Sequence, residues 1–291
     1  VIDQSTGEVK AIVGGRGYKT ASTTLNSAPA TTRQPGSTFK ILAAYSAALD
    51  AGGLTLASVQ DDAPYTYAGA NGKSVNNYDR RYRGFTTLRE AITDSINIVT
   101  VKTLAQAGVS LGWQYVQEYG FTTVDSRDMN EALALGGITQ GVSNLELTAA
   151  YAAIANQGTY IKPKFYTKIL DHDGNVLIDN TTPESHTVIK DTTAWLLTSA
   201  MEDVMTSGTG TSAYFGSSMA QAGKSGTTTS SRDALFAGYT PYYTCAVWGG
   251  YDDNAMQKGS DTNYPKRIWK AVMKRIHENL AYKDLTKPSG I

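Results

Sequence analysis

The chain contains three short motifs that together supply the side chains of a serine acyl-transfer site. They are Ser37-Thr38-Phe39-Lys40, Ser95-Ile96-Asn97 and Lys224-Ser225-Gly226-Thr227. The Ser-x-x-Lys and Lys-Ser-Gly patterns occur once each, whereas Ser-x-Asn also occurs at Ser74-Val75-Asn76. We select the copy at Ser95 because it lies between two predicted helices, where a fixed backbone can aim two side chains. Each motif alone is weak evidence, and only their combination indicates the chemistry.

Ser37 and Lys40 are the candidate nucleophile and base. Three positions apart on a helix, they share one face and can touch. A lysine can take the proton of a serine only as a neutral amine, so its pKa must fall. Burial lowers the pKa of a lysine, and a second cation nearby, such as Lys224, lowers it further. The start of a helix at Ser37 adds a backbone N–H and a positive dipole end, which suit a developing oxyanion.

The other two motifs are suited to binding a peptide. The serine and asparagine of the Ser-x-Asn motif could relay a proton and bind a peptide carbonyl. Lys224 beside the hydroxyls of Ser225 and Thr227 could hold a substrate carboxylate. Because Gly226 has no Cβ, we expect a substrate to approach this predicted strand closely enough to pair with it.

Other chemistries find little support in the sequence. Gly223-Lys224-Ser225 ends like a phosphate-binding P-loop, but Ser218 occupies the position of the required glycine. The single cysteine, Cys245, excludes an internal disulfide and a thiolate zinc cluster, and the three histidines lack metal-ligand spacing. The 26 basic and 26 acidic residues balance, which argues against nucleic acid binding. We therefore predict no cofactor, no metal and no nucleic acid partner.

The pattern of apolar residues predicts a mixed α/β chain without regular alternation of strands and helices. A hairpin of Val1–Asp3 and Val9–Val13 and three strands at 219–229, 233–240 and 242–251 would form one antiparallel sheet. A helical block would be inserted between them, and residues 61–84 would form a long loop. Helices are expected from Ser37 to Leu49 and at about 87–94, 97–107, 111–119, 143–157, 191–205 and 264–280, and a second hairpin at 160–180. The first and last helices are candidates to cover the sheet.

The three motifs, in this order, resemble those of penicillin-binding proteins and serine β-lactamases. The surrounding sequence is similar to the class A, bifunctional penicillin-binding proteins at Arg33 to Lys40, at Gly136-Gly137-Ile138-Thr139 with 145–158, and at 222–252. The resemblance implies a transpeptidase domain over 1–291, with a sheet subdomain of about 1–36 and 190–291 and an inserted helical subdomain of about 37–160. It also implies a glycosyltransferase domain and a membrane anchor before residue 1, and a place on the extracytoplasmic face of the bacterial plasma membrane.

The activity that the resemblance implies is cross-linking of peptidoglycan stem peptides. A donor ending in D-Ala-D-Ala would acylate the serine and release its last D-Ala, and an amine of a second stem peptide would then take the acyl group. β-Lactams mimic D-Ala-D-Ala and would acylate the same serine. The implied site residues are the nucleophile Ser37, its base Lys40, the proton relay Ser95, the donor-binding Asn97, the substrate-binding Lys224, Ser225, Gly226 and Thr227, and the oxyanion-hole N–H groups of Ser37 and Thr227.

Three other activities fit the same motifs. A D,D-carboxypeptidase would differ only in using water as the acceptor. A β-lactamase would need a further group that activates water, and we identify no glutamate in a suitable position. A non-catalytic β-lactam sensor would use acylation as its signal. Ser225 stands where threonine is commoner in this family, and it retains the hydroxyl.

Two groups outside the motifs have simpler interpretations. The tyrosines of the long loop could line a groove for the acceptor peptide, but a solvated loop is the simpler interpretation. The basic residues of the last helix, Lys266 among them, are interpreted as its solvated face.

Overall fold

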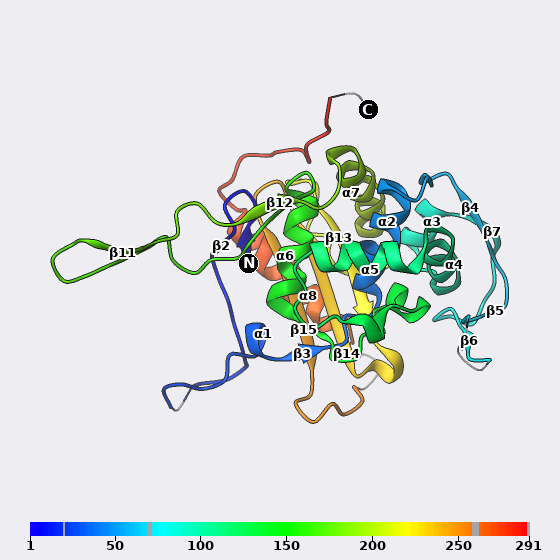
Figure 1. The fold of residues 1–291 in the computed structure, drawn as a ribbon, viewed down its shortest axis with the longest axis horizontal. Helices are drawn as coiled ribbons and strands as arrows, with labels where there is room; N and C mark the ends of the chain where they lie inside the picture. The colour runs from blue at the N-terminus through cyan, green and yellow to red at the C-terminus, as the bar shows by residue number, and fades with distance from the viewer. Residues whose placement is uncertain (20, 69–71, 258–261, 290–291) are drawn as a thin grey trace.

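An antiparallel five-stranded sheet joins the N-terminal hairpin to the late strands of the chain (Figure 1). Its order is β13-β14-β15-β1-β2. The bounds are β1 Ile2–Asp3, β2 Glu8–Val9, β13 Ala222–Thr227, β14 Asp233–Tyr239 and β15 Thr244–Gly250. The computed structural model describes residues 1–19, 21–68, 72–257 and 262–289. The predicted mixed fold is confirmed, with β13, the strand of the Lys-Ser-Gly motif, at one edge of the sheet.

The helices lie mainly between β2 and β13. They are α1 Ser27–Ala30, α2 Ser46–Asp50, α3 Leu88–Thr93, α4 Asn97–Ala107, α5 Val109–Glu118, α6 Asn144–Ala155, α7 Asp191–Thr206 and α8 Tyr264–Ile276. Tighter or wider turns are η1 Gly36–Thr38, η2 Lys40–Tyr45, η3 Ser126–Asp128, η4 Glu131–Leu135, η5 Thr211–Ala213 and η6 Thr229–Ser231. Capping boxes begin α3 at Thr87 and α6 at Ser143, where each hydroxyl is paired with a glutamate three residues later.

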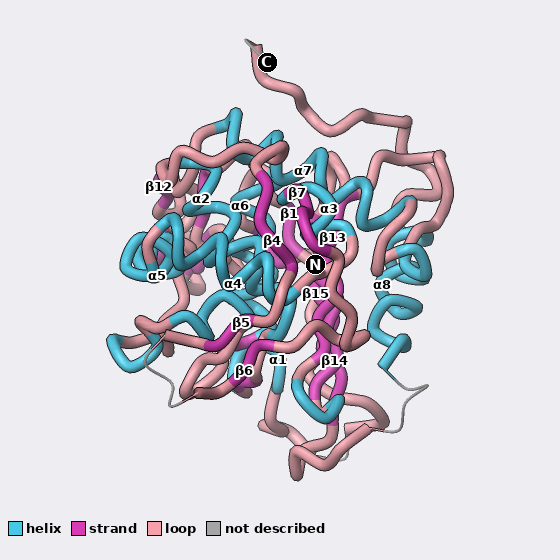
Figure 2. The backbone as a smooth tube through the Cα atoms, turned by 90° about the vertical axis from the view of Figure 1, so that its right-hand side faces the viewer, coloured by secondary structure: helices cyan, strands magenta, loops and turns pink. Residues whose placement is uncertain are grey.

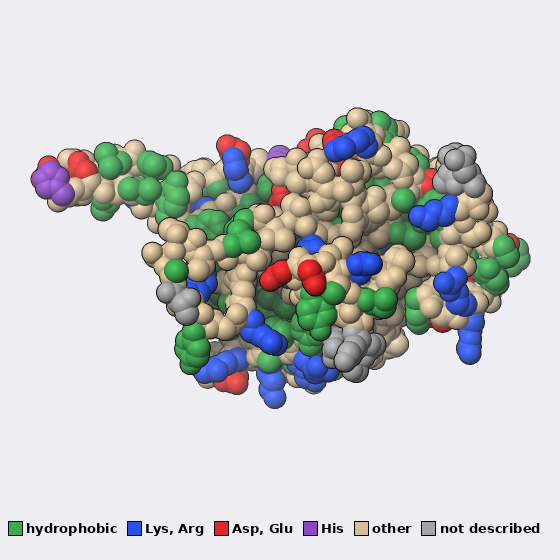
Figure 3. Space-filling model, turned by 90° about the horizontal axis from the view of Figure 1, so that it is seen from below, with side chains coloured by type: hydrophobic (Ala, Val, Ile, Leu, Met, Phe, Trp, Pro, Cys, Tyr) green, Lys and Arg blue, Asp and Glu red, His purple; other side chains and the backbone are tan. Residues whose placement is uncertain are grey.

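Five short strand pairs lie outside the main sheet. They are β3 Thr32–Arg33 with β8 Val142–Ser143, β4 Val59–Asp62 with β7 Gly84–Thr87, β5 Tyr65–Thr66 with β6 Ser74–Val75, β9 Thr159–Ile161 with β12 Ser185–Thr187, and β10 Lys168–Leu170 with β11 Val176–Asp179. The β10–β11 arm projects from the body, and hydrophobic side chains lie along it (Figures 1 and 3). The segment predicted as a long loop over 61–84 therefore contains the β5–β6 pair and is bounded by the β4–β7 pair.

Alternate residues of β14 face two different cores. Phe236 packs against Trp269 and Met273 of α8, whereas Leu235 and Tyr239 belong to the larger core that α6 and α7 share with the sheet. Figure 2 shows α8 on one side of the strands and α4, α5 and α6 on the other. The prediction that the last helix covers the sheet is thus confirmed for α8. The helical segment of η1, η2 and α2 contacts the sheet through its opening turn η1, and the rest of it packs mainly against α4, α5 and α7.

The bounds of several elements differ from the sequence-based prediction, most clearly at three of them. The N-terminal hairpin ends at Val9 rather than Val13, because the chain leaves the sheet there and Val13 is exposed. The last helix ends at Ile276, and the hairpin expected over 160–180 is confined to β10 and β11 because β9 pairs with β12 instead. Within the described ranges, no helix is long and apolar enough to cross a bilayer.

Candidate active site

Ser37 lies in the 3-10 turn η1, at the start of the first helical segment. Side chains three positions apart nearly eclipse each other in such a turn, which favours the approach of Ser37 and Lys40. Beyond the turn the chain forms the π-helix η2, and only Ser46–Asp50 is α-helical. The single helix predicted from Ser37 to Leu49 is therefore replaced by three helical geometries. The wider turn is stabilised by Ser46, whose Oγ donates to Ile41 O five residues earlier (2.9 Å).

Two glycines allow the Ser37 turn to lie directly against β13. Gly36 has a φ of +53°, and a Cβ added there would lie 3.1–3.3 Å from backbone atoms of Thr227. A Cβ added to Gly226 would lie 2.8 Å from Pro35 O and 2.9 Å from Thr38 Cγ2. The position that a Cβ of Gly226 would take is therefore filled by the Ser37 turn, and the approach of a substrate to this strand stays a prediction. The close approach brings the backbone of the turn to that of Thr227.

The backbone of Thr227 is directed to the open edge of the sheet. Its neighbour Thr228 donates its N–H to Asp233 O (3.0 Å), across the ladder that pairs Thr227 with Ala234. Hydrogen-bonded pairs alternate along an antiparallel ladder. The N–H and C=O of Thr227 and Ser225 therefore point away from β14, toward the turn and the free edge.

Lys40 is fully buried and bonded to the Ser-x-Asn motif. Its Nζ donates to Ser95 O (2.7 Å), Ser95 Oγ (3.2 Å) and Asn97 Oδ1 (2.6 Å). Burial holds the pKa of Lys40 well below its usual value, and the charge of Lys224 lowers that pKa further. The described part of the chain offers no hydrogen bond to Ser37 Oγ, and bonds of this kind often form fully only with substrate bound. Both causes of the lowered pKa are those expected from the sequence.

Ser95 connects the two lysines. Its Oγ accepts a hydrogen bond from Lys224 Nζ (2.8 Å) in addition to the one from Lys40. Ser95 is buried and has a φ of +56°, in the left-handed region that costs a residue other than glycine about 1–3 kcal/mol. The turn between α3 and α4 therefore holds this hydroxyl at an energetic cost, between two amines that can exchange a proton through it.

Lys224 is the second fully buried amine, and it lies on the edge strand β13. Besides Ser95 Oγ, its Nζ contacts Ser225 O (3.3 Å). Burial, followed by the charge of Lys266, lowers the pKa of Lys224 to about 7. A bound carboxylate would raise that pKa again, because an opposite charge favours the ammonium form.

Lys266 corrects one expectation, because it is not on the solvated face of the last helix. It is half-buried, and its Nζ donates to Thr209 O (3.0 Å) and Asn263 Oδ1 (3.0 Å). The Oγ1 of the same threonine accepts from Ser225 Oγ (2.8 Å). Thr209 therefore links Lys266 to Ser225 of the Lys-Ser-Gly motif. The motif analysis missed both, since no sequence pattern links residues from three separate segments.

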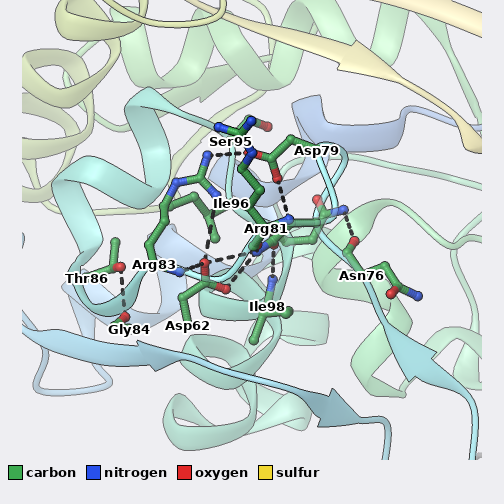
Figure 4. Close-up of polar contacts among 12 residues, drawn as sticks. Asp62, Asn76, Asp79, Arg81, Arg83, Gly84, Thr86, Ser95, Ile96 and Ile98 are labelled. Carbon is green, nitrogen blue, oxygen red and sulfur yellow. Dashed lines mark hydrogen bonds and ion pairs between the residues drawn. The ribbon is translucent and has the colours of Figure 1, made fainter.

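The loop of residues 76–83, between β6 and β7, also reaches the site. Asn97 Nδ2 donates to Asn76 O (2.7 Å), and the loop closes over the start of α4 (Figure 4). Ser74, the serine of the second Ser-x-Asn copy, lies exposed on β6. The structure thus brings together Ser95, Asn97 and both lysines, with the Ser37 turn against β13, and it leaves Ser74 outside. No group of three or more His, Cys, Asp or Glu side chains that could bind a metal exists among the described residues.

Comparisons with known proteins agree with this arrangement. A family model described as the penicillin binding protein transpeptidase domain matches residues 1–277. Penicillin-binding protein 1F of Bacillus subtilis (strain 168) is 38% identical over the whole chain, which covers 40% of that protein. Penicillin-binding protein 1A of Clostridium botulinum (strain Langeland) is 35% identical, again over the whole chain, which covers 36% of that protein. The chain thus spans well under half the length of these relatives.

Solved structures give the same result. Penicillin-binding protein 1A of Haemophilus influenzae superimposes with a TM-score of 0.86 at 27% identity, over 99% of this chain and 48% of that one. PonA1 of Mycobacterium tuberculosis, in complex with penicillin V, gives a TM-score of 0.85 at 25% identity, over 100% of this chain and 80% of that one. The resemblance drawn from the motifs is confirmed. The chain therefore belongs to the penicillin-binding protein family, as a transpeptidase domain of the class A type.

Proposed function

We propose that this chain is a serine D,D-transpeptidase that cross-links peptidoglycan stem peptides. One observation carries the proposal. Two buried amines, Lys40 and Lys224, meet on the hydroxyl of Ser95 beside a turn that sets Ser37 against the edge strand β13. A site of this kind can deprotonate a serine without a histidine or a metal.

Acylation would begin with Ser37. As its Oγ attacks the carbonyl carbon of the penultimate D-Ala, its proton passes to the neutral amine of Lys40. The oxyanion accepts hydrogen bonds from the N–H groups of Ser37 and Thr227. The C–N bond to the last D-Ala then breaks as Ser95 passes its proton to the departing amine. Ser95 takes in exchange the proton that Lys40 received from Ser37, so Lys40 returns to its neutral form. The products are a Ser37 ester and free D-Ala.

The Lys-Ser-Gly strand would hold the donor during this step. Lys224, with the hydroxyls of Ser225 and Thr227, binds the terminal carboxylate. The outward N–H and C=O groups of β13 can pair with an extended peptide at the open edge of the sheet. Asn97 binds the amide of the donor from the other side. The strand would thus favour donors that carry a free C-terminal carboxylate.

Deacylation would transfer the acyl group to an amine of a second stem peptide. That amine attacks the ester carbonyl, and the Ser37 Oγ leaves with a proton. Water in place of the amine would make the chain a D,D-carboxypeptidase, and a stable ester without transfer would make it a sensor. The complex of PonA1 with penicillin V supports β-lactam binding by this chain as well. We further propose that a glycosyltransferase domain and a membrane anchor outside this chain place it on the extracytoplasmic face of the plasma membrane.

The test is intact mass spectrometry after incubation with penicillin, on wild type and Ser37→Ala, followed over hours. A stable adduct of one drug mass on wild type alone is expected. An adduct on both proteins, or on neither although both are folded, would refute the assignment of Ser37. A D-Ala-D-Ala stem peptide supplied with an amine acceptor then separates the activities: the transpeptidase forms a cross-linked product, the carboxypeptidase forms only shortened peptide, and the sensor forms neither.

A further inference from the structure

The first turn of α4, which carries Asn97, is capped by a residue from a distant loop. Ile96, the residue before the helix, offers no side-chain hydrogen bond to it. Instead, Asn77 Oδ1 accepts from the backbone N–H of Asn97 (3.0 Å) and of Ile98 (3.2 Å). The first N–H groups of a helix have no partner within the helix. The amide of Asn77, twenty residues earlier in the chain, supplies one.

A buried carboxylate determines which way that amide faces. Asn77 Nδ2 donates to Asp62 Oδ1 (2.8 Å) and Oδ2 (3.0 Å), and to Arg81 O (2.8 Å). Asp62 is fully buried at the end of β4 and also accepts from Arg83 N (2.9 Å) (Figure 4). An ionised carboxylate only accepts hydrogen bonds, so the NH2 group of Asn77 must face it. The Oδ1 of Asn77 is thereby left for the helix.

The same loop fixes the side chain of Asn97. Asn76 O accepts from Asn97 Nδ2 (2.7 Å), so the Oδ1 of Asn97 is turned toward Lys40 Nζ, which it meets at 2.6 Å. A flipped amide would present its NH2 to the ammonium group instead. The orientation that binds Lys40 therefore depends on two bonds from the loop, one to the backbone and one to the side chain of Asn97.

We propose that Asn77, oriented by Asp62, is a positioning residue for acylation. It sets the first turn of α4 so that Asn97 Oδ1 stays on Lys40 and the amide of Asn97 keeps its place for the donor peptide. The inference rests on the proposed function, in which Lys40 is the base. Asn77 acts through Asn97 and does not itself touch the substrate.

The test uses Asn77→Ala and the rate of acylation by a chromogenic cephalosporin across pH. We expect the maximal acylation rate to fall roughly 10- to 100-fold, the loss typical of a misplaced reacting group. When Asn97 Oδ1 leaves its place, the ammonium form of Lys40 loses a hydrogen-bond acceptor. The charge of Lys224 stays close to it, so the pKa of Lys40 falls. The acid limb of the rate profile should therefore move to lower pH. A purely structural role would lower the amount of active protein equally at every pH and leave the limb in place.

Two further variants in this part of the chain are Asp79→Asn and Ser74→Ala. Asp79 itself pairs with Arg83 (2.8 Å), which holds Asp62, so Asp79→Asn reports on the Asp62 side of the network. The variant that should keep the wild-type rate and limb is Ser74→Ala, because Ser74 lies exposed on β6. A rescue pair covers the case in which Asn77→Ala does not fold. Asn77→Asp places two carboxylates together, and adding Asp62→Asn exchanges donor and acceptor, so the double variant should acylate about 5-fold or more faster than the single one.

The outcomes separate this inference from the proposed function. Wild type that penicillin does not acylate refutes the proposed function itself. Wild type that is acylated normally, with an unchanged rate and limb in folded Asn77→Ala, refutes only the positioning role. A double variant no faster than Asn77→Asp also overturns it, because the exchange restores the acceptor at the start of α4.

Discussion

Replacing Gly226 by alanine tests whether that glycine serves the Ser37 turn or the substrate. The added Cβ would lie 2.8 Å from Pro35 O and 2.9 Å from Thr38 Cγ2, nearer than such contacts allow. The obstacles are a backbone oxygen and a β-branched side chain, so the turn must move away from β13 by several tenths of an ångström. Overpacking of this kind costs about 1–3 kcal/mol of unfolding free energy. The same shift displaces Ser37 from the N–H of Thr227, which should slow acylation about 100-fold.

The assays are urea unfolding and the acylation rate with a chromogenic cephalosporin at saturation. The matched control is Gly15→Ala, where an added Cβ would meet nothing within 4 Å. If the glycine instead leaves room for substrate, Gly226→Ala should keep its stability and its saturated rate and lose only affinity. That result, or an unchanged protein, would show that the turn does not depend on this contact.

Two predictions concern the buried cations. Between the folded pKa of Lys224, about 7, and its unfolded value of 10.5, the unfolded chain binds more protons, so stability rises with pH. Lys224→Met should lower that slope by up to about 1.4 kcal/mol per pH unit, measured by urea unfolding at several pH values, and an unchanged slope would contradict the lowered pKa. Lys266→Gln removes the charge that helps to lower the pKa of Lys224, so the alkaline limb for substrates bearing a carboxylate should move to higher pH, whereas exposed Lys274→Gln should leave it unchanged.

The elements with strong local signals could be predicted from the sequence. The helix expected at 97–107 is observed at those residues, and α6 and α7 differ from prediction by two residues or fewer at each end. Each has a run of apolar residues, and the capping box at Ser143 also marks the start of α6. The pairing of the N-terminal hairpin with the late strands was also predicted, from short strand-like segments separated by turn residues.

The parts of the site that could not be predicted depend on contacts between distant segments. Asn77 reaches α4 across 20 residues, and Lys266 reaches Thr209 across 57. Single asparagines and lysines carry no periodicity, so their neighbours are set by packing alone. Gly226 has the same ambiguity: a strand glycine indicates that something approaches closely, but not whether it is a ligand or another part of the chain.

The exceptions to local rules gather at the site, and this supports the catalytic interpretation independently of the motifs. Among non-glycine residues with positive φ in the described ranges, Ser95 is the one that is buried; the others lie at or near the surface. Lys40 and Lys224 are fully buried with no carboxylate partner in the described part of the chain, and the helix that carries Lys40 widens into a π turn. The positive φ of Ser95 and the two buried amines each destabilise the fold. A chain that only needed to fold would have no reason to retain three such penalties around a single hydroxyl, so their coincidence at Ser95 is best explained by proton transfer there.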